Sequence, residues 1–352
     1  VSTAMIFGLV SLMFLDTSIN MAMQPFKMMV GDMVNEKQKG LAYSIQSFLC
    51  NAGSLVGFLF PFIFTWIGIS NIAPQGVVPD SVIYSFYIGA AILILCVIYT
   101  TVKVKEMPPA EYAEYHGITE EEEKEKINMV KLLVKAPKAF WTVGLVQFFC
   151  WFAFMFMWTY TNGSVAANVF DAPTVETAVN GVSKVMLDTK SIQYQDAADW
   201  VGVLFAVQAI GSVLWAVCIP LFKDRKLIYS LSLVLGGLGF ISTYFVHNQY
   251  VLFISFLLIG CAWAAMLALP FTILTNALSG GHMGTYLGLF NGTICIPQIV
   301  AASLGGSILA LFTPKGMLPP EINMLVMAGV MLIIGAVCVY LIKETKGEQT
   351  KA

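Results

Sequence analysis

Asp16 is the one charged side chain near the middle of a long apolar run, which extends from Met5 to Phe26. Asn20, Gln24 and Lys27 follow it at helical spacing, so the four side chains fall within about 80° of one helix face. A carboxylate at the centre of a bilayer costs roughly 2.5–3.5 kcal/mol on insertion scales. Because a desolvated carboxylate favours its neutral form, a proton could bind and leave as the surroundings of Asp16 dry and rehydrate. The pattern makes Asp16 a candidate functional residue, and the alternative is a structural carboxylate bonded to a neighbouring helix.

Amide and indole side chains lie on single faces of several other apolar runs. These candidate ligands are Gln147, Trp151, Trp158, Gln208, Trp263, Asn291 and Gln298. Aromatic rings stack on the C–H faces of sugars, and amides bind hydroxyl groups, so an apolar cavity with these groups would suit a sugar. Taken singly, each could serve helix packing instead. Packing is also the expected role of the small and polar residues Ser47, Asn51, Gly53, Gly57, Gly284 and Gly288.

The elements that must position these side chains are membrane helices. Of 352 residues, 58% are hydrophobic and 11% are charged, and the mean hydropathy is +0.77, whereas soluble domains carry about 25% charged residues. A membrane helix needs about 20 apolar residues, and the period-2 alternation of a β-barrel is absent. The sequence therefore predicts an all-α membrane protein with nine spans: 1–30, 40–68, 81–102, 139–161, 198–222, 227–246, 250–278, 285–312 and 321–342.

Several classes of function are disfavoured by what the chain contains. The seven cysteines are spread among the spans without Cys-x-x-Cys spacing, and the three histidines fall in loops or at span ends. We therefore expect no metal, no cofactor and no membrane-embedded enzyme. A net charge of −2 with no basic patch does not favour nucleic acid. A sugar sensor stays open as an alternative, although the tail 343–352 is too short for an output domain.

Basic residues are distributed unevenly between the two sides of the predicted spans. Sixteen of the nineteen Lys and Arg residues fall on one side, within 27–39, 103–138, 223–226 and 343–351. Because cytoplasmic loops carry the excess of Lys and Arg, we expect these segments in the cytoplasm and the loops 69–80 and 162–197 outside. The expected location is the cell (inner or plasma) membrane, with lipid around the spans.

The hydrophilic segment 103–138 divides the spans into three and six. Its acidic run, Glu120 to Lys126, suits a solvated linker, and 127–135 alternates apolar and basic residues as an amphipathic surface helix does. A tether is expected here, with regulation as the alternative. The motif Gln24-Pro25-Phe26 recurs as Leu269-Pro270-Phe271, which indicates a six-helix repeat. Parallel six-helix repeats joined by such a loop resemble the major facilitator architecture.

On this resemblance, nine of the twelve helices of a major facilitator fold are present and the first three are missing. The expected segments are 1–102, a remnant of the N-terminal bundle (helices 4–6); 103–138, the linker; 139–342, the C-terminal bundle (helices 7–12); and 343–352, a cytoplasmic tail. The piece is expected not to transport without those three helices.

A more specific resemblance comes from the first span. Asp16, Asn20, Pro25, Lys27 and Asp32 stand at the spacing of the fourth-helix signature of the sucrose–proton symporters and their relatives, with Lys27 where the family usually has Arg. Other segments similar to the bacterial members are 147–152, 200–202, 260–263, 284–291 and 297–298.

This resemblance implies proton-coupled symport of a disaccharide or other glycoside by alternating access, with the complete protein a monomer. Asp16 would couple the proton and contact sugar, and Lys27 and Asp32 would belong to the cytoplasmic gate. Lysine offers a point charge without the planar fork of arginine, so a bidentate ion pair is not expected there. Asp224 and Arg225 occupy the place of the gating loop motif between the second and third helices of a half. Sodium coupling of the melibiose type stays open as the alternative.

Overall fold

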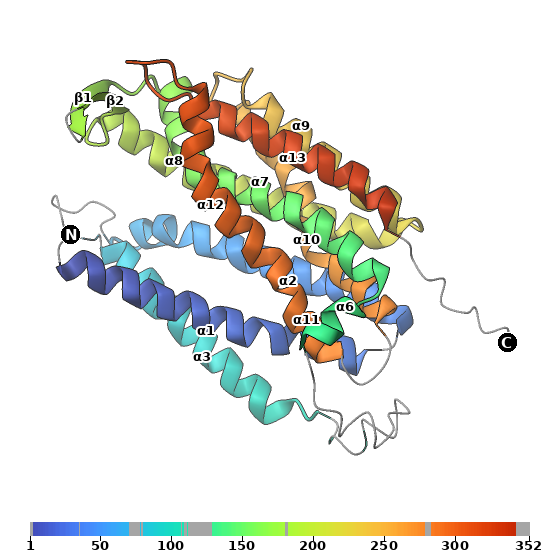
Figure 1. Ribbon diagram of the computed structural model, residues 1–352. Helices are drawn as coiled ribbons and strands as arrows, with labels where there is room; N and C mark the ends of the chain where they lie inside the picture. Colours follow the sequence, from blue (N-terminus) through green and yellow to red (C-terminus); the bar gives the residue numbers. More distant parts are fainter. Residues whose placement is uncertain are drawn as a thin grey trace.

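The computed structural model describes residues 3–34, 36–69, 78, 80–106, 108, 111, 129–179, 182–278 and 283–342. Nearly all of this is helical (Figure 1). The helices are α1 (Thr3–Met33), α2 (Glu36–Trp66), α3 (Asp80–Lys103), α6 (Met129–Val134), α7 (Lys138–Asn168), α8 (Ile192–Cys218), α9 (Arg225–Ser242), α10 (Leu252–Ala277), α11 (Met283–Phe290), α12 (Gly292–Phe312) and α13 (Ile322–Cys338). Short 3₁₀ turns extend α8 and α13.

All nine predicted spans are largely helical in this structure, which confirms the all-α fold. Within the described residues, eight helical segments are long and apolar enough to cross a membrane. The remaining predicted span, 40–68, lies largely in α2, which has 31 residues. This helix buries the polar side chains of Ser44, Ser47 and Asn51. The predicted span 285–312 is two helices, because the helix is interrupted at Asn291 between α11 and α12.

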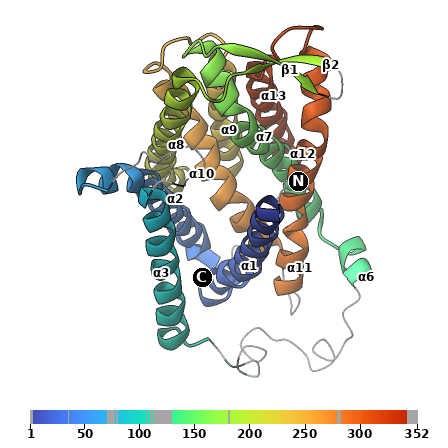
Figure 2. The same ribbon diagram turned by 90° about the vertical axis from the view of Figure 1, so that its left-hand side faces the viewer.

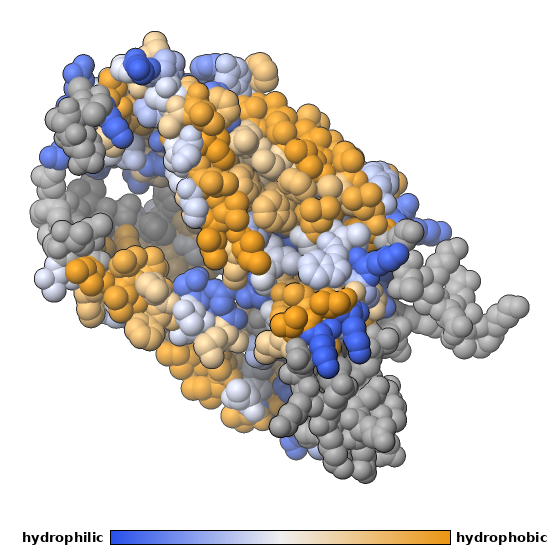
Figure 3. Space-filling view, viewed as in Figure 1, coloured by the Kyte–Doolittle hydropathy of each residue, from blue (hydrophilic) through white to orange (hydrophobic). Residues whose placement is uncertain are grey.

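Helices α7 to α13 pack as one bundle around a large apolar core. Helix α10 lies along α8 and α9, while α7 lies along α12 and α13. Glycines allow the closest of these approaches: a Cβ on Gly329 of α13 would lie 2.6 Å from the carbonyl oxygen of Gly237 on α9. Such contacts between small residues are the usual means of bringing membrane helices together. Figure 3 shows apolar side chains over the outer face of this bundle.

The three N-terminal helices join this bundle mainly through α2. Helix α2 packs on α8 and α10, α1 meets α11 and α2, and α3 meets α2 (Figure 2). Apolar side chains on α1 and α3 are largely exposed in the structure, among them Phe7, Phe14 and Phe86. These surfaces suit contact with lipid or with further membrane helices.

The expected outer loop 162–197 is largely ordered structure, which corrects the prediction. Helix α7 continues to Asn168, and strands β1 (Thr174–Val179) and β2 (Val182–Leu187) pair antiparallel with Thr174 opposite Leu187. Alternating β-branched and polar residues favour such a hairpin. It lies across the end of the bundle at which α7 ends (Figure 2).

Three further predictions have different outcomes. Part of the expected amphipathic helix 127–135 forms α6, and the Tyr286 hydroxyl on α11 donates to the carbonyl oxygen of Leu132 at 3.2 Å. The acidic run 120–126 lies outside the described residues. The packing role predicted for Gly53, Gly57 and Gly288 is wrong for this structure, since a Cβ at each of them would meet no atom within 4 Å.

Candidate functional site

Three tryptophans from α7 and α10 meet in what we call the tryptophan cluster: Trp151, Trp158 and Trp263. The ring of Trp263 stands nearly edge-on to Trp151, at 5.7 Å and 76°, and to Trp158, at 5.8 Å and 81°. Phe154 packs behind Trp263 at 4.8 Å. Trp151 is 9% exposed and Trp158 is 44% exposed, so one side of the cluster is accessible. The arrangement offers aromatic faces and edges to a solute.

Gln147 lies one helical turn before Trp151 on α7 and is fully buried. Its Nε2 donates to the carbonyl oxygen of Met266 on α10 at 3.3 Å. Among the described residues, neither Gln147 Oε1 nor Trp151 Nε1 has a hydrogen-bond partner. Because an unpaired buried polar atom is costly, this acceptor and this donor are groups that a water or a solute hydroxyl could satisfy.

Asp16 on α1 has an exposed side chain. Its carboxylate lies within electrostatic range of the thiol of Cys295 on α12. Asn291 Nδ2 donates weakly to Cys295 Sγ at 3.8 Å. Asn291, a predicted site residue, therefore contacts a thiol that the charge of Asp16 also reaches. Gln298 lies one helical turn after Cys295 and is half-buried.

The other predicted residues of the α1 stripe have different surroundings. Asn20 is half-buried, and its Nδ2 donates to the backbone oxygen of Asp16 at 2.9 Å, within the helix. The side chains of Gln24 and Asp32 lie outside the described part of the chain, so their predicted roles are untested.

Lys27 lies against an aromatic ring of the other half. Its Nζ is 4.3 Å from the centroid of Phe271 on α10, and the Tyr43 hydroxyl on α2 donates to the backbone oxygen of Lys27 at 3.3 Å. A cation over a ring face is attracted by the ring quadrupole. Lys27 thus joins α1 to α10 through a neutral partner.

Phe271 belongs to a row of buried rings that we call the aromatic gate: Tyr43, Phe271, Phe290 and Phe140. Successive ring centroids are 6.1, 5.9 and 5.7 Å apart, and none of the four residues is more than 2% exposed. The row crosses from α2 through α10 and α11 to α7. It was not predicted from the sequence, although Phe271 belongs to the repeated Pro-Phe motif.

The turn before α9 lies at this same end of the molecule. Asp224 caps α9, accepting from the backbone N–H groups of Lys226 and Leu227 at 3.0 and 3.1 Å. A Cβ on Gly40 of α2 would lie 4.0 Å from Nη2 of Arg225. Contacts between the N-terminal helices and the bundle are therefore close here.

At the opposite end the surface is hollowed between α1 and the part of the bundle that carries the hairpin (Figure 3).

Gln208 is buried on α8 and lies at a helix contact. Its backbone meets Gly260 of α10, where a Cβ would overlap the carbonyl oxygen of Gln208. This contact is one turn before Trp263. On α2, Asn51 Nδ2 donates to the Ser47 carbonyl oxygen at 2.7 Å, and Ser47 Oγ donates to that of Ala264 at 3.4 Å. Polar groups thus line the junction of α2, α8 and α10.

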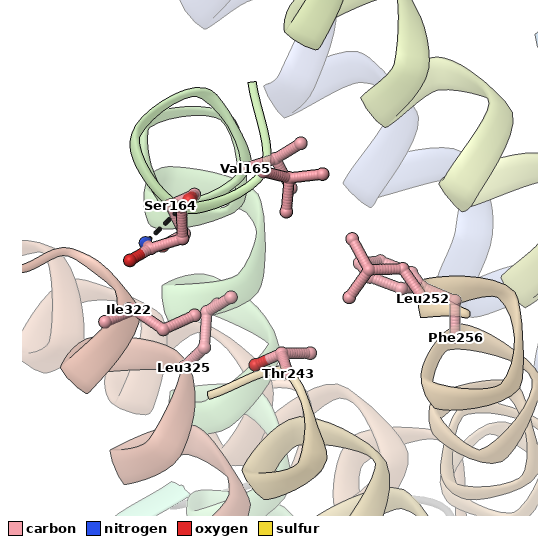
Figure 4. Close-up of a pocket in the computed structure, with 9 residues that line it drawn as sticks. Ser164, Val165, Thr243, Leu252, Phe256, Ile322 and Leu325 are labelled. Carbon is pink, nitrogen blue, oxygen red and sulfur yellow. Dashed lines mark hydrogen bonds between the residues drawn. The ribbon is translucent and has the colours of Figure 1, made fainter. Parts of the chain in front are cut away.

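A small cavity lies elsewhere in the bundle, between α7, α9, α10 and α13 (Figure 4). Its volume is about 10 Å³, and apolar side chains such as Val165, Leu252 and Phe256 dominate its wall. That space is close to the minimum for one water molecule. No predicted site residue lines it, and a solute would not fit.

In the described part of the chain, eight helices are long and apolar enough to cross a membrane, which indicates a multi-pass membrane protein. Comparison with known families gives the same class. The profile of the Major Facilitator Superfamily matches residues 3–187 and again residues 175–352. The chain therefore belongs to this superfamily of membrane transporters. No curated protein matches the chain in sequence.

Proposed function

We propose that this protein is a secondary active transporter that couples proton movement to symport of a disaccharide or other glycoside. The observation that supports this most directly is the position of Asp16. It is the one charged residue near the middle of a span, it is exposed, and its charge reaches the thiol of Cys295 on α12, which Asn291 contacts. An acid between the two halves can be hydrated in one state and dry in another, and that change favours proton release and proton uptake in turn.

The solute would bind between α1, α7, α10 and α12. The tryptophan cluster offers rings to the apolar face of a sugar, while Gln147 Oε1 and Trp151 Nε1 offer one acceptor and one donor. Asn20, Asn291 and Gln298 are half-buried amides that would bind further hydroxyls. When Asp16 is protonated and its oxygens are bound to sugar hydroxyls, the site carries no buried charge. The loaded protein could then change from facing one side of the membrane to facing the other.

Alternating access would use the aromatic gate and the turn before α9. Closure at Lys27 and Phe271, together with the hollow at the opposite end, supports an outward-facing state if the Lys-rich side is cytoplasmic. Opening the gate would separate α1 and α2 from α10 and admit the solute to the cell. Asp224 holds the start of α9 in place while Arg225 lies against α2.

The test is uptake of labelled sucrose, maltose and melibiose by proteoliposomes that contain the full-length protein, with and without an inward proton gradient. We expect one of these sugars to accumulate only with the gradient, and Asp16→Asn to abolish accumulation while leaving exchange of that sugar across the membrane. Asn20→Asp, which moves the acid one turn along α1, is the matched control and should not restore coupling in the Asp16→Asn background. Unchanged accumulation by Asp16→Asn would refute the coupling role. Accumulation driven by sodium alone would identify the melibiose-type alternative.

A further inference from the structure

Pro270 lies inside α10 and leaves a backbone carbonyl without its helical partner. Proline has no N–H, so residue 270 cannot donate to the carbonyl oxygen of residue 266, four positions earlier. That residue, Met266, is fully buried, and an unpaired buried carbonyl destabilises the fold. Membrane helices tolerate prolines where a neighbouring helix satisfies the freed group.

The group that satisfies it here is the side chain of Gln147 on α7. Its Nε2 donates to the Met266 carbonyl oxygen at 3.3 Å, and Gln147 is 0% exposed. This hydrogen bond therefore replaces, between two helices, the bond that the proline removes within one. It ties α7 to the position at which the proline interrupts the hydrogen bonding of α10.

The bond also fixes how the rings of the tryptophan cluster meet. Trp151 lies four residues after Gln147 on α7, and Trp263 lies three residues before Met266 on α10. Each is one helical turn from the bond. Their edge-to-face contact at 5.7 Å and 76° therefore depends on the relative height and rotation of the two helices at Gln147.

A second proline provides a comparison within the same bundle. Pro297 inside α12 cannot donate to the carbonyl oxygen of Thr293. Helix α7 meets this residue one turn before Gln147, because a Cβ on Gly144 would lie 2.9 Å from Thr293 Cγ2. Gly144 has no side chain that could donate to the Thr293 carbonyl, whereas Gln147 donates to the freed carbonyl of Met266.

We infer that Gln147 is a positioning residue, whose amide takes the place of the missing N–H of residue 270 and holds Trp263 against Trp151. This role goes beyond the proposed symport and does not depend on which solute or ion is moved. It also differs from direct solute binding, because it acts through Nε2, while only Oε1 is left for a ligand.

A double-substitution cycle on the full-length protein in detergent tests the bond. Gln147→Met keeps the bulk of the side chain and removes its donor, so the thermal midpoint should fall by about 2–4 °C. Pro270→Ala supplies an N–H to the Met266 carbonyl, so adding Gln147→Met in that background should change the midpoint little. If Pro270→Ala does not fold, Pro270→Ser supplies the same N–H. Equal shifts from Gln147→Met with and without the proline would overturn the inference.

Two matched controls and one spectroscopic measurement separate positioning from general packing. Gln147→Met combined with Pro297→Ala should be additive, as should Gln208→Met combined with Pro270→Ala. Edge-to-face indoles give an exciton couplet in circular dichroism. Gln147→Met should weaken that couplet, while Gln208→Met should leave it unchanged even if it lowers the midpoint. An unchanged couplet in Gln147→Met would show that the amide does not set the tryptophan geometry.

Discussion

Replacing Phe271 by leucine tests how much the aromatic gate contributes to the free energy that favours the closed state. Leucine keeps most of the buried apolar bulk but removes the ring, and with it the contacts that Phe271 makes to Tyr43 on α2 and to Lys27 on α1. The contact with Phe290 lies within the bundle and does not change when the halves separate. A ring pair contributes about 0.5–1.5 kcal/mol, and a cation over a ring contributes about 0.5–2 kcal/mol.

The contacts across the halves therefore sum to about 1–3.5 kcal/mol. Because 1.4 kcal/mol is a factor of ten, Phe271→Leu should lower the ratio of closed to open molecules at this end by about 5- to 300-fold. A protein that is almost entirely closed would then have a measurable open fraction.

Spin labels on either side of this end can measure that fraction. Met33 on α1 and Leu227 on α9 are exposed, at 54% and 50%, and can be labelled after replacement of the native cysteines. Pulsed dipolar spectroscopy should show a longer distance gaining population in Phe271→Leu. Phe154→Leu is the matched control, since Phe154 contacts rings only within the bundle. An unchanged distribution in Phe271→Leu, or the same change in Phe154→Leu, would refute the gate.

Three further predictions concern stability, measured as the thermal midpoint in detergent. Burial raises the pKa of Glu321, just before α13, from 4.5 to about 7. The folded protein therefore binds this proton more tightly than the unfolded chain and loses stability as pH rises from 4.5 to 7. Glu321→Gln should remove that loss, raising the midpoint at pH 8 and leaving it unchanged at pH 4.5; equal changes at both would contradict this. Asp224→Ala should lower the midpoint through loss of the α9 cap, which is worth about 1 kcal/mol; no decrease would show that water replaces the cap. Gly329→Ala, which pushes a Cβ against the Gly237 carbonyl, should destabilise by about 1–3 kcal/mol, whereas Gly306→Ala, with open space around it, should not.

The hydropathy pattern predicts the helical fold well because lipid requires long apolar helices. It predicts the ends of helices less well. Helix α7 was expected to end at 161 but continues to Asn168, because Gly163 and Ser164 are buried against neighbouring helices. The hairpin lies in the segment 162–197, for which a loop was predicted. Its signal was present: two short alternating segments flank Asn180-Gly181, a common two-residue hairpin turn.

The candidate site was predicted where it depends on helical spacing and missed where it depends on tertiary contacts. Faces of α7 and α12 follow from 100° per residue, and the structure brings Trp151, Trp158 and Trp263 together. The contact of Lys27 with Phe271 joins residues far apart in sequence, so no spacing rule could give it. The hydrogen-bond partner of Gln147 is the backbone carbonyl of Met266, which Pro270 leaves without an N–H donor. Knowing which side chains share a helix face does not predict a contact with the backbone.

The neutral partner of Lys27 determines what is left behind when the two halves come apart. An ion pair that separates in a membrane strands two opposite charges, and each must be hydrated again. When Lys27 leaves the ring of Phe271, this contact leaves one ammonium to be hydrated and no charge on Phe271. Attraction to a ring also decays within a few ångströms. Separation should therefore need little travel and respond weakly to ionic strength, while the negative charge of Asp16 stays uncommitted to this lysine.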